Sequence, residues 1–339
     1  MPTETTPNTT ANETPSSDVL AIGQCTADLF MQIKGGSVET EENGAKVCFY
    51  HGSKVVVEKF DMMPGGNPLN VAVGLRKQGI KTAVYSEIGD DNNADDIVTT
   101  LKEAGADTSM CHKNKGSHTN VSTIISYMGD RTIFGYHHDQ TFKIQDWGTP
   151  EIIYFSSMPN GYEGFHKELI EWVEKNPETM LVFNPGTLHF KNGVETFSDI
   201  LKVADVLIVN QEEAEQITKM GSGRGGDTQK NVDEEYLEKL HTGLQKLGPK
   251  LTAITLGKDG ASAYAGGKLE RSEVHHPEGK ALVDRTGAGD AFSSGFVGAL
   301  FYKKPLKEAL RWGIVNSGHV ITEIGAIHGV LTKEEISSK

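Results

Sequence analysis

Short runs of hydrophobic residues recur along the chain, and stretches with helical periodicity separate them. The first run, Val19–Ile22, is followed directly by Gly23. Apolar runs of about four to eight residues, bounded by turn residues, are typical of strands buried on both faces of a parallel sheet. Similar runs occupy residues 82–88, 152–156, 180–183, 206–209 and 251–256, with helical patterns at 93–104, 164–174, 192–202, 212–219 and 233–247. This alternation predicts an α/β fold whose parallel sheet is covered by helices on both faces.

Two stretches interrupt the alternation. In the first, residues 46–50 and 55–60 flank His51–Lys54. In the second, residues 120–127 and 132–136 flank Met128–Arg131. Because both central segments contain glycine, both stretches are predicted to be β-hairpins. They predict a small antiparallel lid that projects from the main sheet.

The two ends of the chain differ in character. Residues 1–17 are polar and rich in Thr, Asn, Pro and Glu, which predicts a disordered tail. Residues 18–335 are predicted to form one domain, with the lid hairpins at about 31–62 and 118–138. Residues 288–302 and 306–324 have helical patterns and are expected to complete the domain.

The segment Asp284–Asp290 carries the strongest chemical signal. Its small residues Gly287, Ala288 and Gly289 stand directly before an apolar helix. The unpaired N–H groups and the dipole at such a helix start make an anion site suited to a phosphate. Asp290, beside that site, could take a proton from an attacking hydroxyl group. The alternative is structural, because acidic residues are favoured in the first turn of any helix.

Two further motifs place polar groups next to glycines or strand ends. Gly65 and Gly66 would let the backbone approach a ligand, and Asn67 and Asn70 could hydrogen-bond sugar hydroxyls. The alternative is a glycine turn followed by an Asn-capped helix.

Asn210 and Glu213 follow the apolar run at 206–209. They fit either a helix capping box or the outer ligands of a hydrated magnesium ion. The spacing allows both at once.

Charge and cysteine content indicate which partners and which compartment to expect for this protein. Acidic residues outnumber basic ones by 46 to 33, a formal net charge of −13, which argues against nucleic-acid and anionic-membrane partners. The three cysteines are scattered, as suits a reducing cytosol, and no apolar run approaches the ~20 residues of a membrane span. We therefore expect a cytoplasmic protein.

Some apparent motifs are rejected. Gly221–Gly226 matches a dinucleotide fingerprint, but it follows a helical pattern instead of a strand, so a hydride-transfer enzyme is disfavoured. The pairs His137–His138 and His275–His276 lack the spacing of a helical metal site. The sequence contains no P-loop motif, so any nucleotide must be bound in another way.

The two glycine motifs, in this order, resemble the signatures of the ribokinase-like (PfkB) carbohydrate kinase family. The resemblance implies a Rossmann-like three-layer sandwich with a β-lid, and an ATP-dependent kinase acting on an alcohol group. It implies that Asp290 is the catalytic base and that Gly287, Ala288 and Gly289 form the anion hole. The remaining implied residues are Asp28, Gly65, Gly66, Asn67 and Asn70 for the sugar, Asn210, Glu213, Thr255, Gly257, Gly260 and Asn316 for nucleotide and Mg²⁺, and Asp284, Thr286 and Gly325 for a monovalent cation such as K⁺.

The resemblance leaves the acceptor open. A free sugar such as ribose or fructose is our first expectation, and a nucleoside or sugar phosphate is the alternative. A sugar-phosphate kinase should carry basic lid residues, for which the candidates are Lys46, Lys54, Lys59, Arg131 and Lys143. A non-catalytic sensor on the same fold is a third possibility, although it would not need Asp290. The family also implies a homodimer formed through the lid, and Arg285 departs from the usual small residue at its position.

Overall fold

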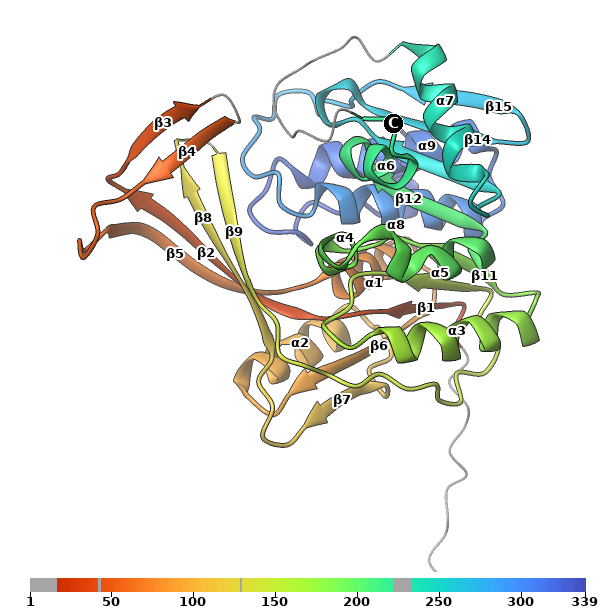
Figure 1. The fold of residues 1–339 in the computed structure, drawn as a ribbon, viewed down its shortest axis with the longest axis horizontal. Coiled ribbons are helices and arrows are strands. Elements are labelled where there is room, and N and C mark those ends of the chain that lie inside the picture. The colour runs from red at the N-terminus through yellow and green to blue at the C-terminus, as the bar shows by residue number, and fades with distance from the viewer. Residues whose placement is uncertain (1–16, 42–43, 129, 222–232) are drawn as a thin grey trace, which may run out of the picture.

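The computed structural model describes residues 17–41, 44–128, 130–221 and 233–339. Its centre is a nine-stranded sheet with the order β15-β14-β13-β12-β11-β10-β1-β6-β7 (Figure 1). The strands are parallel from β13 to β7, and β14 and β15 are added antiparallel at one edge. The bounds are β1 Val19–Ile22, β6 Thr82–Gly89, β7 Cys111–Asn114, β10 Ile152–Phe155, β11 Met180–Phe183, β12 Val206–Asn210, β13 Leu251–Thr255, β14 Ala261–Ala265 and β15 Lys268–Ser272.

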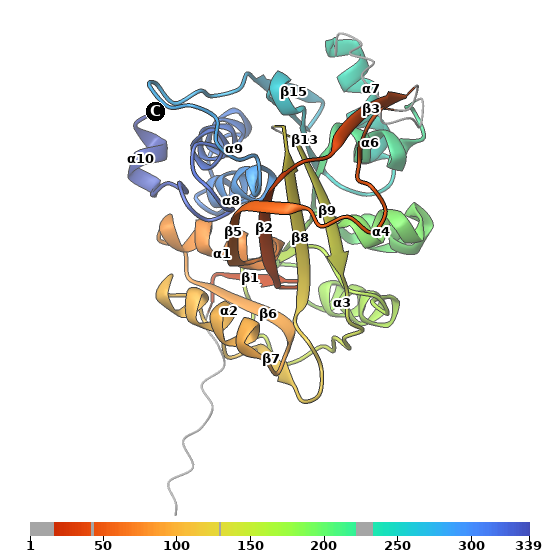
Figure 2. The same cartoon turned by 90° about the vertical axis from the view of Figure 1, so that its left-hand side faces the viewer.

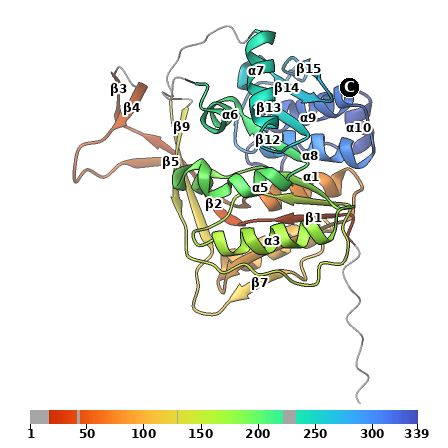
Figure 3. The ribbon, with the colours of Figure 1, turned by 45° about the vertical axis from the view of Figure 1, so that its right-hand side comes forward.

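Helices cover both faces of this sheet (Figure 3). Successive residues of β1 show why, since Val19 and Ala21 belong to one hydrophobic core and Leu20 and Ile22 to the other. The helices are α1 Asn67–Lys77, α2 Asn92–Glu103, α3 Glu163–Lys175, α4 Thr187–Asn192, α5 Ser198–Val203, α6 Gln211–Thr218, α7 Glu234–Gln245, α8 Ala288–Phe301, α9 Leu306–Val320 and α10 Lys333–Ser337. The predicted three-layer α/β sandwich is confirmed.

A second sheet projects from the domain as a lid (Figure 1). Its strand order is β5-β2-β8-β9 (Figure 2). Its strands are β2 Thr26–Lys34, β5 Val56–Gly65, β8 Asn120–Tyr127 and β9 Asp130–Tyr136. The β2–β5 and β8–β9 pairs are antiparallel, and β2–β8 is parallel. A separate ribbon of β3 Ser37–Glu41 and β4 Gly44–Cys48 extends from the end of the lid (Figure 1).

The pairing of the first predicted hairpin is wrong. Residues 46–48 pair with β3, whereas residues 56–65 pair with β2 along its length. Gly35 and Gly36, whose φ angles of 98° and 121° suit glycine, separate β2 from β3, so that β3 pairs with β4 and leaves β2 to pair with β5. The second hairpin is confirmed, because β8 and β9 pair antiparallel, from Val121 with Tyr136 to Tyr127 with Asp130.

Two helix boundaries also differ from the sequence expectation. The predicted helix at 192–202 is not continuous: Asn192 ends α4, Gly193 breaks the helix with a φ of 101°, and a 3₁₀ turn at Val194–Phe197 leads into α5. The last long helix, α9, ends at Val320, earlier than predicted. The expected tail up to residue 16 and the glycine-rich stretch from 222 to 231 lie outside the described residues. Within the described part, no helix combines the length and apolar character needed to cross a membrane.

Candidate active site

A cavity of about 490 Å³ lies where the lid meets the carboxyl ends of the parallel strands. Polar residues that follow strands line it, as do lid residues and the start of α8. Ligands of open α/β sheets bind at this edge because loops there diverge to either side of the sheet. The cavity is therefore where the chemistry of this protein is expected.

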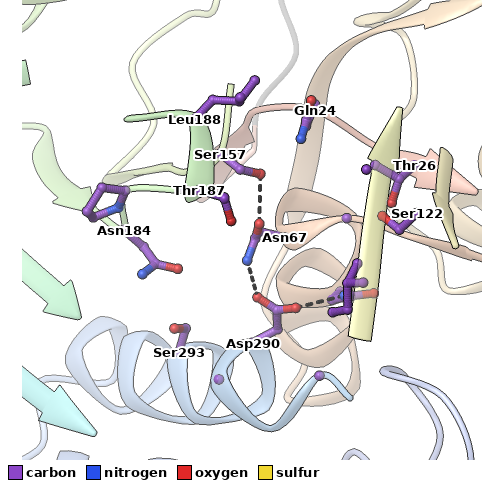
Figure 4. Close-up of a pocket in the computed structure, with 18 of the residues that line it drawn as sticks. Gln24, Thr26, Asn67, Ser122, Ser157, Asn184, Thr187, Leu188, Asp290 and Ser293 are labelled. Carbon is purple, nitrogen blue, oxygen red and sulfur yellow. Dashed lines mark hydrogen bonds between the residues drawn. The ribbon is translucent and has the colours of Figure 1, made fainter. Parts of the chain in front are cut away.

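Asp290 lies in the floor of this cavity, in the first turn of α8 (Figure 4). The Asn67 side-chain amide donates to Asp290 Oδ1 at 2.6 Å, and the Asn70 amide donates to Oδ2 at 2.8 Å. Ser157 Oγ donates to Asn67 Oδ1 at 2.7 Å, which fixes the amide's orientation. The two sequence motifs thus meet, with α1 orienting the carboxylate that α8 presents.

Burial raises the pKa of Asp290 to about 6, and the nearby negative charge of Asp28 adds to the shift. The hydrogen bonds from Asn70 and Asn67 act in the opposite direction, since they stabilise the ionised form. A carboxylate with a pKa near 6 is ionised at neutral pH and is a stronger base than an exposed one. These are the properties of a general base.

The start of α8 has the geometry of an anion site. Gly287 adopts the left-handed conformation at a φ of 76°, and a Cβ there would overlap Ala326. Among the described residues, no hydrogen-bond partner is found for the N–H groups of Gly289 and Asp290, while the Ala288 N–H contacts Arg285 O at 3.3 Å. These N–H groups lie beside the Asp290 carboxylate, at the positive end of the helix dipole.

Asp28 adds a second carboxylate to the cavity wall. Its Oδ1 accepts from Thr26 Oγ1 at 2.8 Å, and burial raises its pKa although hydrogen bonds from Thr26 and Ser122 lower it. Gly65 does not line the cavity, but a Cβ at this position would overlap the Asp28 carboxylate. The missing side chain of Gly65 therefore leaves the space that the Asp28 carboxylate occupies. Gly66, with a φ of 93°, lines the cavity itself.

Asn210 and Glu213 form the capping box of α6 and also line the cavity. Burial raises the pKa of Glu213 to about 7, against the hydrogen bond from the Asn210 backbone. In the described residues, no three His, Cys, Asp or Glu side chains gather as a metal site. One carboxylate beside an amide oxygen nevertheless fits Mg²⁺, which keeps most of its waters and takes few protein ligands.

The remaining nucleotide candidates separate into two groups. Thr255 lines the cavity, but Gly257 and Gly260 do not: Gly257 begins the short 3₁₀ turn Gly257–Asp259 beyond β13, and Gly260 follows it. Asn316 is buried between α8 and α9, away from the cavity lining. Its amide donates to Ala291 O at 2.8 Å and to Ser294 Oγ at 3.1 Å, and its Oδ1 accepts from the Leu331 N–H at 2.9 Å. This side chain is fully occupied in joining the two helices.

Asp284, Thr286 and Gly325 lie together beside the anion site. Asp284 Oδ1 accepts from the Thr286 N–H at 2.9 Å and from Thr286 Oγ1 at 2.8 Å, and Oδ2 accepts from the Gly325 N–H at 3.3 Å. Arg131, on lid strand β9, lies 3.8 Å from Asp284 Oδ1. Arg285 lies between Asp284 and Thr286 in the chain, but its side chain is exposed.

Known proteins resemble this chain over most of its length. The family model described as "pfkB family carbohydrate kinase" matches residues 33–333. The chain belongs to the pfkB family of carbohydrate kinases. It is 27% identical over 276 residues to an ATP-dependent 6-phosphofructokinase of Thermoanaerobacterium thermosaccharolyticum, covering 78% of this chain and 80% of the relative. It is 23% identical over 349 residues to a 5-dehydro-2-deoxygluconokinase of Bacillus subtilis, covering 96% and 97%.

Solved structures confirm the fold of this pfkB family member. The Arabidopsis thaliana ribokinase complexed with ribose and ATP superposes with a TM-score of 0.77 at 18% identity, covering 96% of this chain and 98% of that one. The family assignment makes the protein a kinase, and the curated relatives are sugar kinases of several specificities.

Several cavity residues of this pfkB kinase were not foreseen from the sequence. They are Gln24, Thr26, Ser122, Ile133, Gly135, His137, Ser157, Asn184, Pro185, Gly186, Thr187, Leu188, Ile208, Val209 and Ser293. Gln24, Ser157 and Asn184 come within two residues of the carboxyl ends of β1, β10 and β11. Their signal was present in the sequence, because polar residues directly after buried parallel strands converge on one edge of the sheet.

Proposed function

We propose that this protein transfers the γ-phosphoryl group of ATP to a hydroxyl group of a free sugar such as ribose or fructose. The observation that carries the proposal is the Asp290 carboxylate, oriented by the Asn67 and Asn70 amides beside the first turn of α8. A positioned base next to a cluster of unpaired N–H groups is the arrangement that phosphoryl transfer to an alcohol requires.

In this mechanism Asp290 accepts the proton of the attacking hydroxyl group. The N–H groups at the start of α8 stabilise the negative charge that develops on the transferred group. Asp28, on the lid strand β2, accepts a hydrogen bond from another hydroxyl of the sugar and so orients it. Closure of the lid over the cavity excludes water, which limits hydrolysis of the nucleotide.

Two cation sites belong to the proposal. Glu213 and Asn210 would hold Mg²⁺ through water, and Mg²⁺ supplies charge neutralisation of the nucleotide phosphates. The Asp284 carboxylate, with Thr286 and Gly325, would hold K⁺ or another monovalent cation next to the anion site. Thr255 would contact the nucleotide from the end of β13.

The lining of the cavity supports a free sugar as the acceptor. Among the described residues, no Lys or Arg lines it, and the lid candidates Lys46, Lys54, Lys59, Arg131 and Lys143 all lie outside the lining. A sugar phosphate would leave its phosphate charge without a cationic partner there. Within the described part of the chain, the lining also contains no Phe, Tyr or Trp on which a nucleoside base could stack. A non-catalytic sensor would have no need of the raised pKa of Asp290.

We also propose that the protein is a homodimer formed through the lid. Large apolar side chains are exposed on its outer strands: Phe60 (64%), Met62 (49%), Phe134 (58%) and Tyr136 (52%). An exposed apolar patch of this kind is typical of a protein–protein contact. Light scattering of the purified protein should give twice the mass of the chain, and a monomer would refute this part.

A panel of acceptors tests the function. ADP release is measured with ATP, Mg²⁺ and free sugars, nucleosides, sugar acids or sugar phosphates, each with and without K⁺. Asp290→Asn should lose about 100- to 10,000-fold in kcat, as expected for a missing general base, while ATP binding measured by calorimetry is kept. Near-normal turnover of this variant would sink the assignment of Asp290.

A further inference from the structure

A chain of hydrogen bonds at the end of the cavity away from Asp290 fixes the orientation of two polar side chains. The His138 N–H donates to Asn120 Oδ1 at 2.7 Å. Asn120 Nδ2 must therefore be the atom that faces Gln24, and it donates to Gln24 Oε1 at 3.0 Å. Because a backbone N–H can only donate, this first bond removes the usual ambiguity between amide O and N in both side chains.

The same chain assigns the tautomer of His137. Its Nδ1 lies 3.2 Å from Gln24 Oε1, which is an acceptor, so Nδ1 carries the proton. Burial lowers the pKa of His137, and the positive charge of Lys191 lowers it further, so the ring is neutral at pH 7. In a neutral ring with a proton on Nδ1, Nε2 is left with a lone pair and can only accept.

Two groups of opposite character therefore remain for a ligand. Gln24 Nε2 has no hydrogen-bond partner among the described residues and can donate, and His137 Nε2 can accept. Both residues line the cavity, and Figure 4 shows Gln24 on the side away from Asp290 with Asn67 between them. A hydroxyl group satisfies such a pair, because it accepts one hydrogen bond and donates another. A carboxylate or a phosphate dianion would direct only lone pairs at His137 Nε2.

We propose that Gln24 and His137, aligned by Asn120, are the specificity-determining residues of the acceptor site, and that they select an acceptor whose far end carries a neutral hydroxyl group. The inference rests on the proposed kinase function and adds to it. It separates this protein by chemistry from relatives whose names specify a sugar phosphate or a sugar acid, namely the 6-phosphofructokinase and the 5-dehydro-2-deoxygluconokinase. A sugar phosphate and a sugar acid are both negatively charged. Among the described residues, no Lys or Arg lines the cavity to pair with either charge.

The test compares acceptor kinetics of the wild type and two variants. His137→Phe keeps a ring of similar size but loses the acceptor, and Gln24→Glu keeps Oε1 but replaces the donor. Each should raise the KM for the preferred neutral sugar roughly tenfold or more, the loss expected for one hydrogen bond, with the KM for ATP unchanged. His112→Phe is the matched control, because His112 bonds Gln145 and does not line the cavity. The melting temperature of each variant shows that it is folded.

The outcomes separate the inference from the function. If the wild type phosphorylates neutral sugars, and both variants raise the KM for the acceptor without changing the KM for ATP, the inference is supported. If it phosphorylates sugar acids or sugar phosphates more efficiently than neutral sugars, or if neither variant changes the acceptor KM, the inference is overturned and the kinase function stands. If it phosphorylates no acceptor at all, the proposed function fails and the inference falls with it.

Discussion

The amide of Asn67 donates to Asp290 Oδ1 at 2.6 Å, although 223 residues separate the two in sequence. Asn67 is the first residue of α1 and Asp290 lies in the first turn of α8, so the bond joins the starts of two adjacent helices. The orientation of the candidate base thus depends on how closely α1 and α8 pack.

The first prediction concerns pH. Burial raises the pKa of Asp290 to about 6, and only the ionised carboxylate can accept a proton. With saturating Mg²⁺, which favours the ionised form of Glu213, activity should therefore be full above this pKa and fall about tenfold per pH unit below it. A profile of kcat/KM from pH 4.5 to 8 measures this acid limb, and a limb near pH 4 would contradict the assigned environment of Asp290.

The second prediction concerns the hydrogen bond from Asn70. The Asn70 amide stabilises the ionised form of Asp290, so Asn70→Ala should raise the pKa of Asp290 further. The acid limb of the pH profile should move upward by about one unit, as expected for one hydrogen bond to a charged group. Asn92→Ala, an exposed change at the start of α2, is the control that should leave the limb in place. An unshifted limb in Asn70→Ala would show that the bond is absent in solution.

The third prediction concerns the contact between α1 and α8. A Cβ at Gly74 would overlap the Ser294 side chain of α8. Gly74→Ala should lower the free energy of unfolding by about 1–3 kcal/mol through overpacking, and should lower kcat because it separates Asn67 and Asn70 from Asp290.

Gly164→Ala, in α3, is the matched control for this change. A Cβ there meets no atom within 4 Å, so this variant should be as stable as the wild type or slightly more stable. Urea unfolding of both variants measures the difference, and equal midpoints would contradict the close contact.

The fourth prediction concerns Asn316, which the family resemblance implies for the nucleotide. Its side chain is 0% exposed and makes three hydrogen bonds between α8, α9 and Leu331. Asn316→Ala should lower the free energy of unfolding by about 2–4 kcal/mol, because it leaves buried polar groups unpaired. The ATP affinity of the folded variant should change less than about threefold, because Asn316 does not line the cavity and could affect ATP only indirectly. Normal stability with lost ATP binding would restore the nucleotide role.

The sequence by itself determined the layered fold and the chemistry of the main motif. Buried strands such as Val19–Ile22 are recognisable because both of their faces must be apolar, and the start of α8 is recognisable because its turn requires Gly287. Asp290 follows from its place in that local segment. Local sequence is sufficient where the physical requirement is itself local.

Only the tertiary structure decided the pairing of the lid strands and the far side of the site. The exposed lid strands carry no pattern that distinguishes β4 from β2 as the partner of β5, so the pairing is decided by contacts that the local sequence does not show. Gln24 and His137 meet because β1 and the end of the lid converge in space, and Asn316 is buried because α8 and α9 pack closely. Such contacts join residues far apart in the chain, and no local pattern encodes them.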